Sequence, residues 1–153
     1  MKKLQHKIPP PIITLLIGLI MWGLHRFFPI GIIDFSALFY LGIISILVGL
    51  SLDVISFLNF QKNKTTVNPL SPDKATSLVI EGFYRFTRNP MYLGMLLILT
   101  GVAMLFGSFV SFFTLPVFVL IMNTLQIKPE EEALEKVFTD EYLDYKNKVR
   151  RWI

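Results

Sequence analysis

The sequence predicts an all-α integral membrane protein with four transmembrane helices, the last two forming a tight hairpin, and a cytoplasmic amphipathic helix at the C-terminus. Of the 153 residues, 53% are hydrophobic, which is too many for an ordinary soluble domain. Residues 35–52 and 91–125 contain no charged side chain at all. The length corresponds to one membrane-embedded domain, residues 1–153.

Composition also excludes several kinds of chemistry. The chain has no cysteine and only two histidines, so disulfides, thiolate nucleophiles and clustered metal ligands are not expected. We therefore predict no metal. The formal net charge is +4, but the positions of the charges relative to the apolar runs point to a lipid bilayer as the partner and not to nucleic acid.

The first span is predicted over residues 9–28. Lysines precede it, and prolines 9–11 occupy its first turn, where a missing N–H is tolerated. A signal peptide has a similar beginning, but no small-residue cleavage site follows here. The run ends instead in His25-Arg26, which favours a transmembrane helix.

The second span is predicted over residues 35–60. Its uncharged part, residues 35–52, corresponds to about 27 Å of helix against a hydrocarbon core of about 30 Å. Asp53 should therefore lie near one membrane face. It is either an interfacial acid that reaches the lipid headgroups or a substrate-binding residue that points into a site.

Residues 61–90 form a polar loop, and residues 91–106 and 109–125 form the predicted hairpin. Each arm would be about 24–26 Å long, which barely spans the bilayer. Pro116 should kink the second arm. The tail, residues 129–153, has apolar and aromatic residues at helical spacing, so it should lie on the membrane surface or pack over the loop as a lid.

The basic residues predict the orientation. All 15 except Arg26 lie before the first span, in the loop 61–90 or after the fourth span. The positive-inside rule then places both termini, the loop and the lid in the cytoplasm. A short chain of this kind suggests a bacterial inner membrane.

The sequence Arg88-Asn89-Pro90 predicts the start of a helix, with Asn89 as the cap and Pro90 at the first position. Helix N-termini bind anions, so a cofactor carboxylate fits here beside Arg88. Tyr92 offers a ring or a hydroxyl, and Gly94 permits close approach to the backbone. The simpler interpretation is a well-formed start to a transmembrane helix.

Two motifs, Tyr84-Arg85-x-x-Arg88-Asn89-Pro90-x-Tyr92-x-Gly94 and Glu130-Glu131-x-x-Leu134-x-x-x-Phe138-x-x-x-Tyr142-x-x-Tyr145, resemble the isoprenylcysteine carboxyl methyltransferase family. Phospholipid N-methyltransferases share parts of this pattern. The resemblance spans roughly residues 65–153 and implies S-adenosylmethionine as cofactor and a lipophilic methyl acceptor. It implies these cofactor-binding residues: Arg88, Asn89, Pro90, Tyr92, Gly94, Glu131, Tyr142 and Tyr145. It places Glu130 and Gln126 at the reaction centre.

Helical spacing puts Asn123, Gln126 and Glu130 on one face, so Asn123 is a further substrate-binding candidate. The family typically has His at position 89 and Arg at position 126. Because Gln126 supplies no charge for a carboxylate acceptor, a neutral or amine-bearing lipophile is favoured. One alternative is a phospholipid N-methyltransferase with Glu130 as general base. The other is a non-enzymatic membrane scaffold or transporter subunit.

Overall fold

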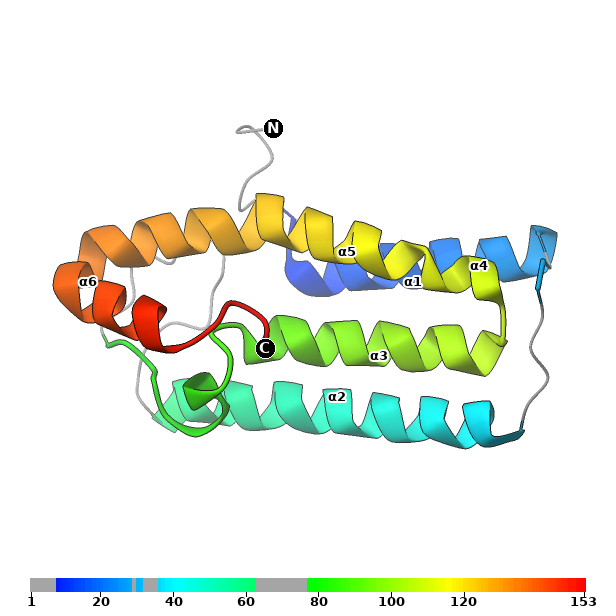
Figure 1. Cartoon of the computed structure of the whole chain (residues 1–153), viewed down its shortest axis with the longest axis horizontal. Helices are drawn as coiled ribbons and strands as arrows, with labels where there is room; N and C mark the ends of the chain where they lie inside the picture. The colour runs from blue at the N-terminus through cyan, green and yellow to red at the C-terminus, as the bar shows by residue number, and fades with distance from the viewer. Residues whose placement is uncertain (1–7, 29, 32–35, 63–76) are drawn as a thin grey trace.

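The computed structural model describes residues 8–28, 30–31, 36–62 and 77–153, and the described chain is helical, which confirms the predicted fold class. In chain order the elements are α1 (Pro10–Phe27), α2 (Ser36–Lys62), the 3₁₀-helix η3 (Gly82–Arg85), α3 (Pro90–Phe106), α4 (Phe109–Phe112), α5 (Thr114–Met122), the π-helical turn η4 (Asn123–Ile127) and α6 (Lys128–Lys148) (Figure 1).

Three helical stretches are long and apolar enough to cross a membrane, namely α1, α2 and the continuous stretch from Phe109 to Lys148. The fourth apolar helix, α3, has 17 residues and is about 26 Å long. It is also the central helix, since it packs against α1, α2 and α5 (Figure 1). Helix α3 is therefore the shortest of these four apolar stretches, and the other three pack around it.

Helices α2 and α3 run antiparallel and meet through paired glycines. A Cβ on Gly49 would come within 2.6 Å of the Gly94 carbonyl oxygen, and one on Gly101 within 2.5 Å of the Gly42 carbonyl oxygen. The two glycines on each helix are seven residues apart, so the pairs repeat along the contact. Small residues allow membrane helices to approach this closely. This contact fixes the register of α3 against α2.

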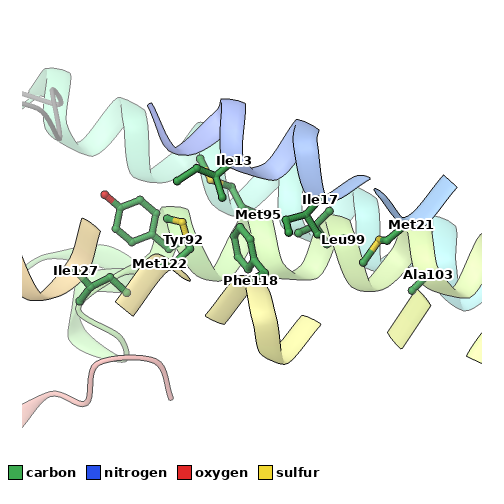
Figure 2. Close-up of a cluster of buried hydrophobic side chains, with 10 residues drawn as sticks. All are labelled: Ile13, Ile17, Met21, Tyr92, Met95, Leu99, Ala103, Phe118, Met122 and Ile127. Atoms are coloured by element: carbon green, nitrogen blue, oxygen red, sulfur yellow. The ribbon is translucent and has the colours of Figure 1, made fainter. Parts of the chain in front are cut away.

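On its other side, α3 packs against α1 and α5 through an apolar core. Ile13, Ile17 and Met21 come from α1, and Leu99 and Ala103 from α3 (Figure 2). The core continues along α5 and η4 with three further buried residues. These are Phe118, Met122 and Ile127.

The hairpin turn begins at Gly107, which adopts a left-handed conformation with φ of 58° and ends α3. The second arm breaks at Phe113, between α4 and α5. Pro116 explains the break, because it lacks an N–H and its ring clashes with the Phe112 carbonyl one turn earlier. Phe113 keeps right-handed helical dihedrals, with φ of −66° and ψ of −16°, so the kink at Pro116 stays a prediction.

The lid does not begin a separate helix at Pro129. It continues from α5 through the π-helical turn η4 into α6. A break follows at Thr139, where φ is 42° and ψ is −116°. The second half of α6 then turns back, and the C-terminus lies beside the start of α3 (Figure 1). The lid therefore packs over the segment before α3, which is one of its two expected arrangements.

Candidate active site at the start of α3

Helix α3 begins as predicted, with Asn89 as the N-cap residue and Pro90 at the first position. The expected side-chain cap is absent, because the Asn89 Nδ2 donates to the Arg151 carbonyl oxygen at 2.9 Å. The Asn89 backbone N–H donates a hydrogen bond to the Thr87 hydroxyl oxygen at 3.2 Å. The amide of Asn89 thus connects the start of α3 to the C-terminal tail.

Glu131 is the centre of a buried ion-pair network. Its Oε1 lies 3.0 Å from Arg88 Nη2 and accepts a 3.0 Å hydrogen bond from Arg151 Nε. Its Oε2 pairs with Arg151 Nη2. The hydrogen bond to Glu131 raises the pKa of Arg151. Glu131, assigned to the cofactor by resemblance, therefore has both carboxylate oxygens engaged within the protein.

The tail is also attached through main-chain carbonyls. The Arg88 N–H donates to the Arg150 carbonyl oxygen at 2.9 Å, and Arg88 Nη1 donates to the Lys146 carbonyl oxygen at 3.2 Å. The Thr87 hydroxyl donates to the Arg151 carbonyl oxygen at 3.2 Å. Arg88, the candidate for the cofactor carboxylate, therefore holds the tail in this structure.

Tyr92 and Glu130 form the pair of greatest chemical interest. The Tyr92 hydroxyl donates a short hydrogen bond to Glu130 Oε1 in the first turn of α6. Burial raises the pKa of Glu130 to about 8, although the hydrogen bond from Tyr92 opposes this shift; the nearby charge of Glu131 adds to it. A carboxyl group with this pKa exchanges its proton near neutral pH, as a general base must.

Three more tyrosines line the region. Tyr145 donates its hydroxyl to the Tyr84 carbonyl oxygen at 2.7 Å, and its ring lies 6.1 Å from that of Tyr142. All three are buried, and burial raises their pKa values above the usual range for tyrosine. They stay neutral and supply aromatic surface. Tyr84 belongs to the first motif, although sequence reasoning gave it no role.

Asp53 explains the glycine at position 94. A Cβ on Gly94 would lie 2.1 Å from Asp53 Oδ1 and 2.8 Å from the Gly49 carbonyl oxygen. The group that approaches this backbone most closely is thus the Asp53 carboxyl. Asp53 Oδ1 thus lies against α3, and its role as an interfacial acid or a substrate-binding residue stays a prediction.

Asn123 and Gln126 belong to the π-helical turn, whose wider winding changes the angular spacing on which the predicted common face with Glu130 depends. Asn123 Oδ1 accepts from the Trp152 indole at 3.1 Å. Gln126 is fully buried and donates to the Ile8 carbonyl oxygen at 2.7 Å. The three side chains therefore contact three different parts of the chain.

Four buried polar atoms on α2, on η4 and before α3 have no hydrogen-bond partner within the described part of the chain. They are Asp53 Oδ1, Ser56 Oγ, Arg88 Nε and Gln126 Oε1. Native proteins leave few such atoms unpaired, so a group of them needs an explanation. The set contains acceptors and a donor, which suits a ligand that carries both.

A family model for phospholipid methyltransferases matches residues 37–141, more than half of the sequence. The chain belongs to the phospholipid methyltransferase family. The match contains α2, α3 and the Tyr92–Glu130 pair. Tyr142, Tyr145 and Arg151 lie beyond it, and no sequence signal identified Arg151.

Two curated proteins are similar to parts of this chain. An uncharacterised protein of Haemophilus influenzae is 44% identical over 63 residues, which cover 41% of this chain and all of that protein. The protein-S-isoprenylcysteine O-methyltransferase of Schizosaccharomyces pombe is 35% identical over 72 residues, which cover 47% of this chain and 30% of that enzyme. No solved structure matches. Together with the apolar helices, these findings identify a membrane methyltransferase.

Proposed function

We propose that this family member transfers a methyl group from S-adenosylmethionine to a lipophilic acceptor that enters from the bilayer. The Tyr92–Glu130 hydrogen bond at the start of α3 is the observation that carries the proposal. The orientation inferred from the basic residues would place this pair at the cytoplasmic face, in a bacterial inner membrane. A soluble cofactor and a membrane-embedded acceptor can both reach that position.

Glu130 would act as the general base. Its raised pKa of about 8 leaves part of the population ionised at neutral pH and gives that ionised form a stronger proton affinity. The Tyr92 hydroxyl would orient the carboxyl group through its hydrogen bond. The acceptor's nucleophilic atom loses a proton on methylation if it is an amine or a hydroxyl, and Glu130 would take that proton.

The residues present fit the proposed cofactor. When bound, S-adenosylmethionine supplies an activated methyl group together with amino, carboxylate and hydroxyl groups. The unpaired buried atoms include acceptor oxygens on Asp53 and Gln126 and a donor nitrogen on Arg88. Tyr84, Tyr142 and Tyr145 add neutral aromatic surface for stacking. The buried polar atoms and the rings together support a ligand that has both charge and an aromatic base.

The charges near the site favour an amine-bearing or neutral acceptor. Arg88 and Arg151 are both paired with Glu131, although Arg88 Nε has no hydrogen-bond partner among the described residues. The Gln126 side chain carries no positive charge, and its Oε1 has no hydrogen-bond partner among the described residues. A carboxylate acceptor would find no free guanidinium among these residues. This favours a phospholipid amine over an isoprenylcysteine carboxylate, the acceptor class that the S. pombe relative's name suggests.

The test is an assay of the purified protein with S-adenosylmethionine labelled in the methyl group, using phosphatidylethanolamine, a neutral lipophile and a prenylcysteine analogue as acceptors. Labelled lipid identified by mass spectrometry is the expected result with the first or second acceptor. Glu130→Gln should abolish the product while cofactor binding persists. No transfer to any acceptor, together with no cofactor binding, would leave the scaffold alternative as the better explanation.

A further inference from the structure

Two side chains on α2 carry buried oxygens that have no hydrogen-bond partner within the described residues, and one of them, Asp53 Oδ1, lies against Gly94 of α3. Asp53 and Ser56 are three residues apart, so they are neighbours on one face of the helix. Asp53 Oδ1 and Ser56 Oγ are buried and have no hydrogen-bond partner within the described residues. Ser56 is completely buried. This arrangement was not visible in the sequence, where Ser56 carries no signal.

A carboxyl group at this place is costly without a partner. Asp53 belongs to a membrane-spanning helix, where an ionised acid is normally paired or faces a polar cavity. Its Oδ1 lies against Gly94, which offers only a Cα–H group. Such a contact is too weak to compensate for a buried charge. The geometry of the α2–α3 contact therefore preserves space for a carboxyl group and leaves it without a counter-charge.

The surroundings connect Asp53 to the candidate active site. Burial is the main cause of the raised pKa of Tyr84, and the nearby Tyr145, Glu130 and Asp53 add to the rise. Both acids are therefore within electrostatic range of Tyr84. Arg88, a cation at the start of the same helix α3, is paired with Glu131. Asp53 has no ion pair within the described part of the chain.

We propose that Asp53 and Ser56, with Gly94 opposite, form a subsite that binds a small positively charged group. This inference rests on the proposed function, because methyl transfer brings such groups to this end of the bundle. One source is the sulfonium or amino group of the cofactor, and the other is the ammonium group of an amine acceptor. Asp53 would supply the charge and Ser56 a hydrogen-bonding oxygen.

The variants are chosen to separate charge from packing. Asp53→Asn removes the charge at nearly constant shape. Gly94→Ala adds a Cβ that would displace the carboxyl group. Gly101→Ala is its matched control, because it disturbs the same helix contact through Gly42 without touching Asp53. Each variant is purified in detergent, and its unfolding temperature is measured first.

Calorimetric titration gives the Kd for S-adenosylmethionine, and the labelled assay gives the KM for phosphatidylethanolamine in mixed micelles. Asp53→Asn should fold at least as well as the wild type, because a neutral amide costs less to bury. It should raise one of these constants roughly tenfold or more. A raised Kd assigns the subsite to the cofactor, and a raised KM with unchanged Kd assigns it to the acceptor. Gly94→Ala should act in the same way, and Gly101→Ala should not.

Less than a twofold change in both constants for a folded Asp53→Asn protein would overturn the inference, whatever Gly94→Ala does. If the wild type itself binds no S-adenosylmethionine, the proposed function fails, and this inference fails with it. The two failures are thus distinguished by the wild-type titration.

Discussion

The Glu131 carboxylate and the Arg151 guanidinium form an ion pair with two contacts. This pair joins the first turn of α6 to the residues that follow α6. Arg88 contacts the same carboxylate from the start of α3. One buried acid thus connects three segments that are distant in the sequence.

Glu131→Gln should destabilise the protein by about 3 kcal/mol, because it leaves two arginines without their counter-charge. Arg151→Gln should cost less, since Arg151 is partly exposed and Arg88 still pairs with Glu131. Thermal unfolding in detergent, followed by tryptophan fluorescence, measures both changes. Lys148→Gln is the control, because Lys148 is an exposed cation near the end of α6. An equal effect of the control would show that net charge, and not the ion pair, determines stability.

The methyl-transfer rate should rise with pH and level off above about 8. Glu130 has its pKa raised to about 8 and must lose its proton to act as a base. The Tyr92 hydrogen bond opposes that rise, so Tyr92→Phe should move the midpoint of the pH profile to still higher pH. Glu130→Gln should lower turnover about a hundredfold or more. Glu132→Gln, at an exposed acid in the same turn, should change neither midpoint nor turnover.

The same pKa predicts how stability depends on pH. The folded protein holds the Glu130 proton more tightly than the unfolded chain, whose carboxyl titrates near 4.5. The Glu130 contribution to stability should therefore be greatest below about 4.5 and decline as the pH rises toward about 8. The difference between wild type and Glu130→Gln in urea unfolding, measured between these limits, isolates that contribution. A difference that does not vary with pH would contradict the raised pKa.

Gln126→Arg should increase activity on a prenylcysteine analogue, since a guanidinium can contact a carboxylate at two points. A charge-assisted hydrogen bond contributes roughly 1.5–3 kcal/mol, where a neutral one contributes about 1. Gln126→Met is the control, because it keeps the volume but removes the hydrogen bond to the Ile8 carbonyl. Good activity of the wild type on prenylcysteine, unchanged by the arginine, would mean that position 126 does not recognise acceptor charge.

A reporter joined to Ile153 through a flexible linker should be cytoplasmic. All basic residues but Arg26 lie at one side of the predicted spans. In the described chain, the Gln126–Ile8 hydrogen bond joins the end of α5 to the start of α1, so both lie at the same end of the bundle. Paired phosphatase and fluorescent-protein fusions measure the location. An extracytoplasmic terminus would reject the orientation.

The helices and the start of the site were predictable because local chemistry determines them. Uncharged runs marked the spans, and Asn89-Pro90 marked the start of α3. The tail contacts were not predictable, because they use the main-chain carbonyls of Arg150 and Arg151, which every residue possesses. Hydrogen bonds of this kind leave no pattern of side-chain types.

The close contact between α2 and α3 has a signal in the sequence. Gly42 and Gly49 repeat at seven residues, as do Gly94 and Gly101. That repeat predicts close helix contact. The repeat does not give the register that brings Asp53 onto Gly94, because this register depends on how α2 and α3 pack against each other. The π-helical turn was equally hidden, because Asn123 to Ile127 continue the apolar periodicity of α5.

Thr139 has a backbone conformation, with φ of 42°, that β-branched residues rarely adopt. Holding Thr139 in this conformation costs on the order of 1–3 kcal/mol, which the contacts of the tail must offset. Tyr142 and Tyr145 lie beyond Thr139. The two tyrosines and the Glu131 partner Arg151 therefore belong to one segment, so any change of conformation at Thr139 would affect all three.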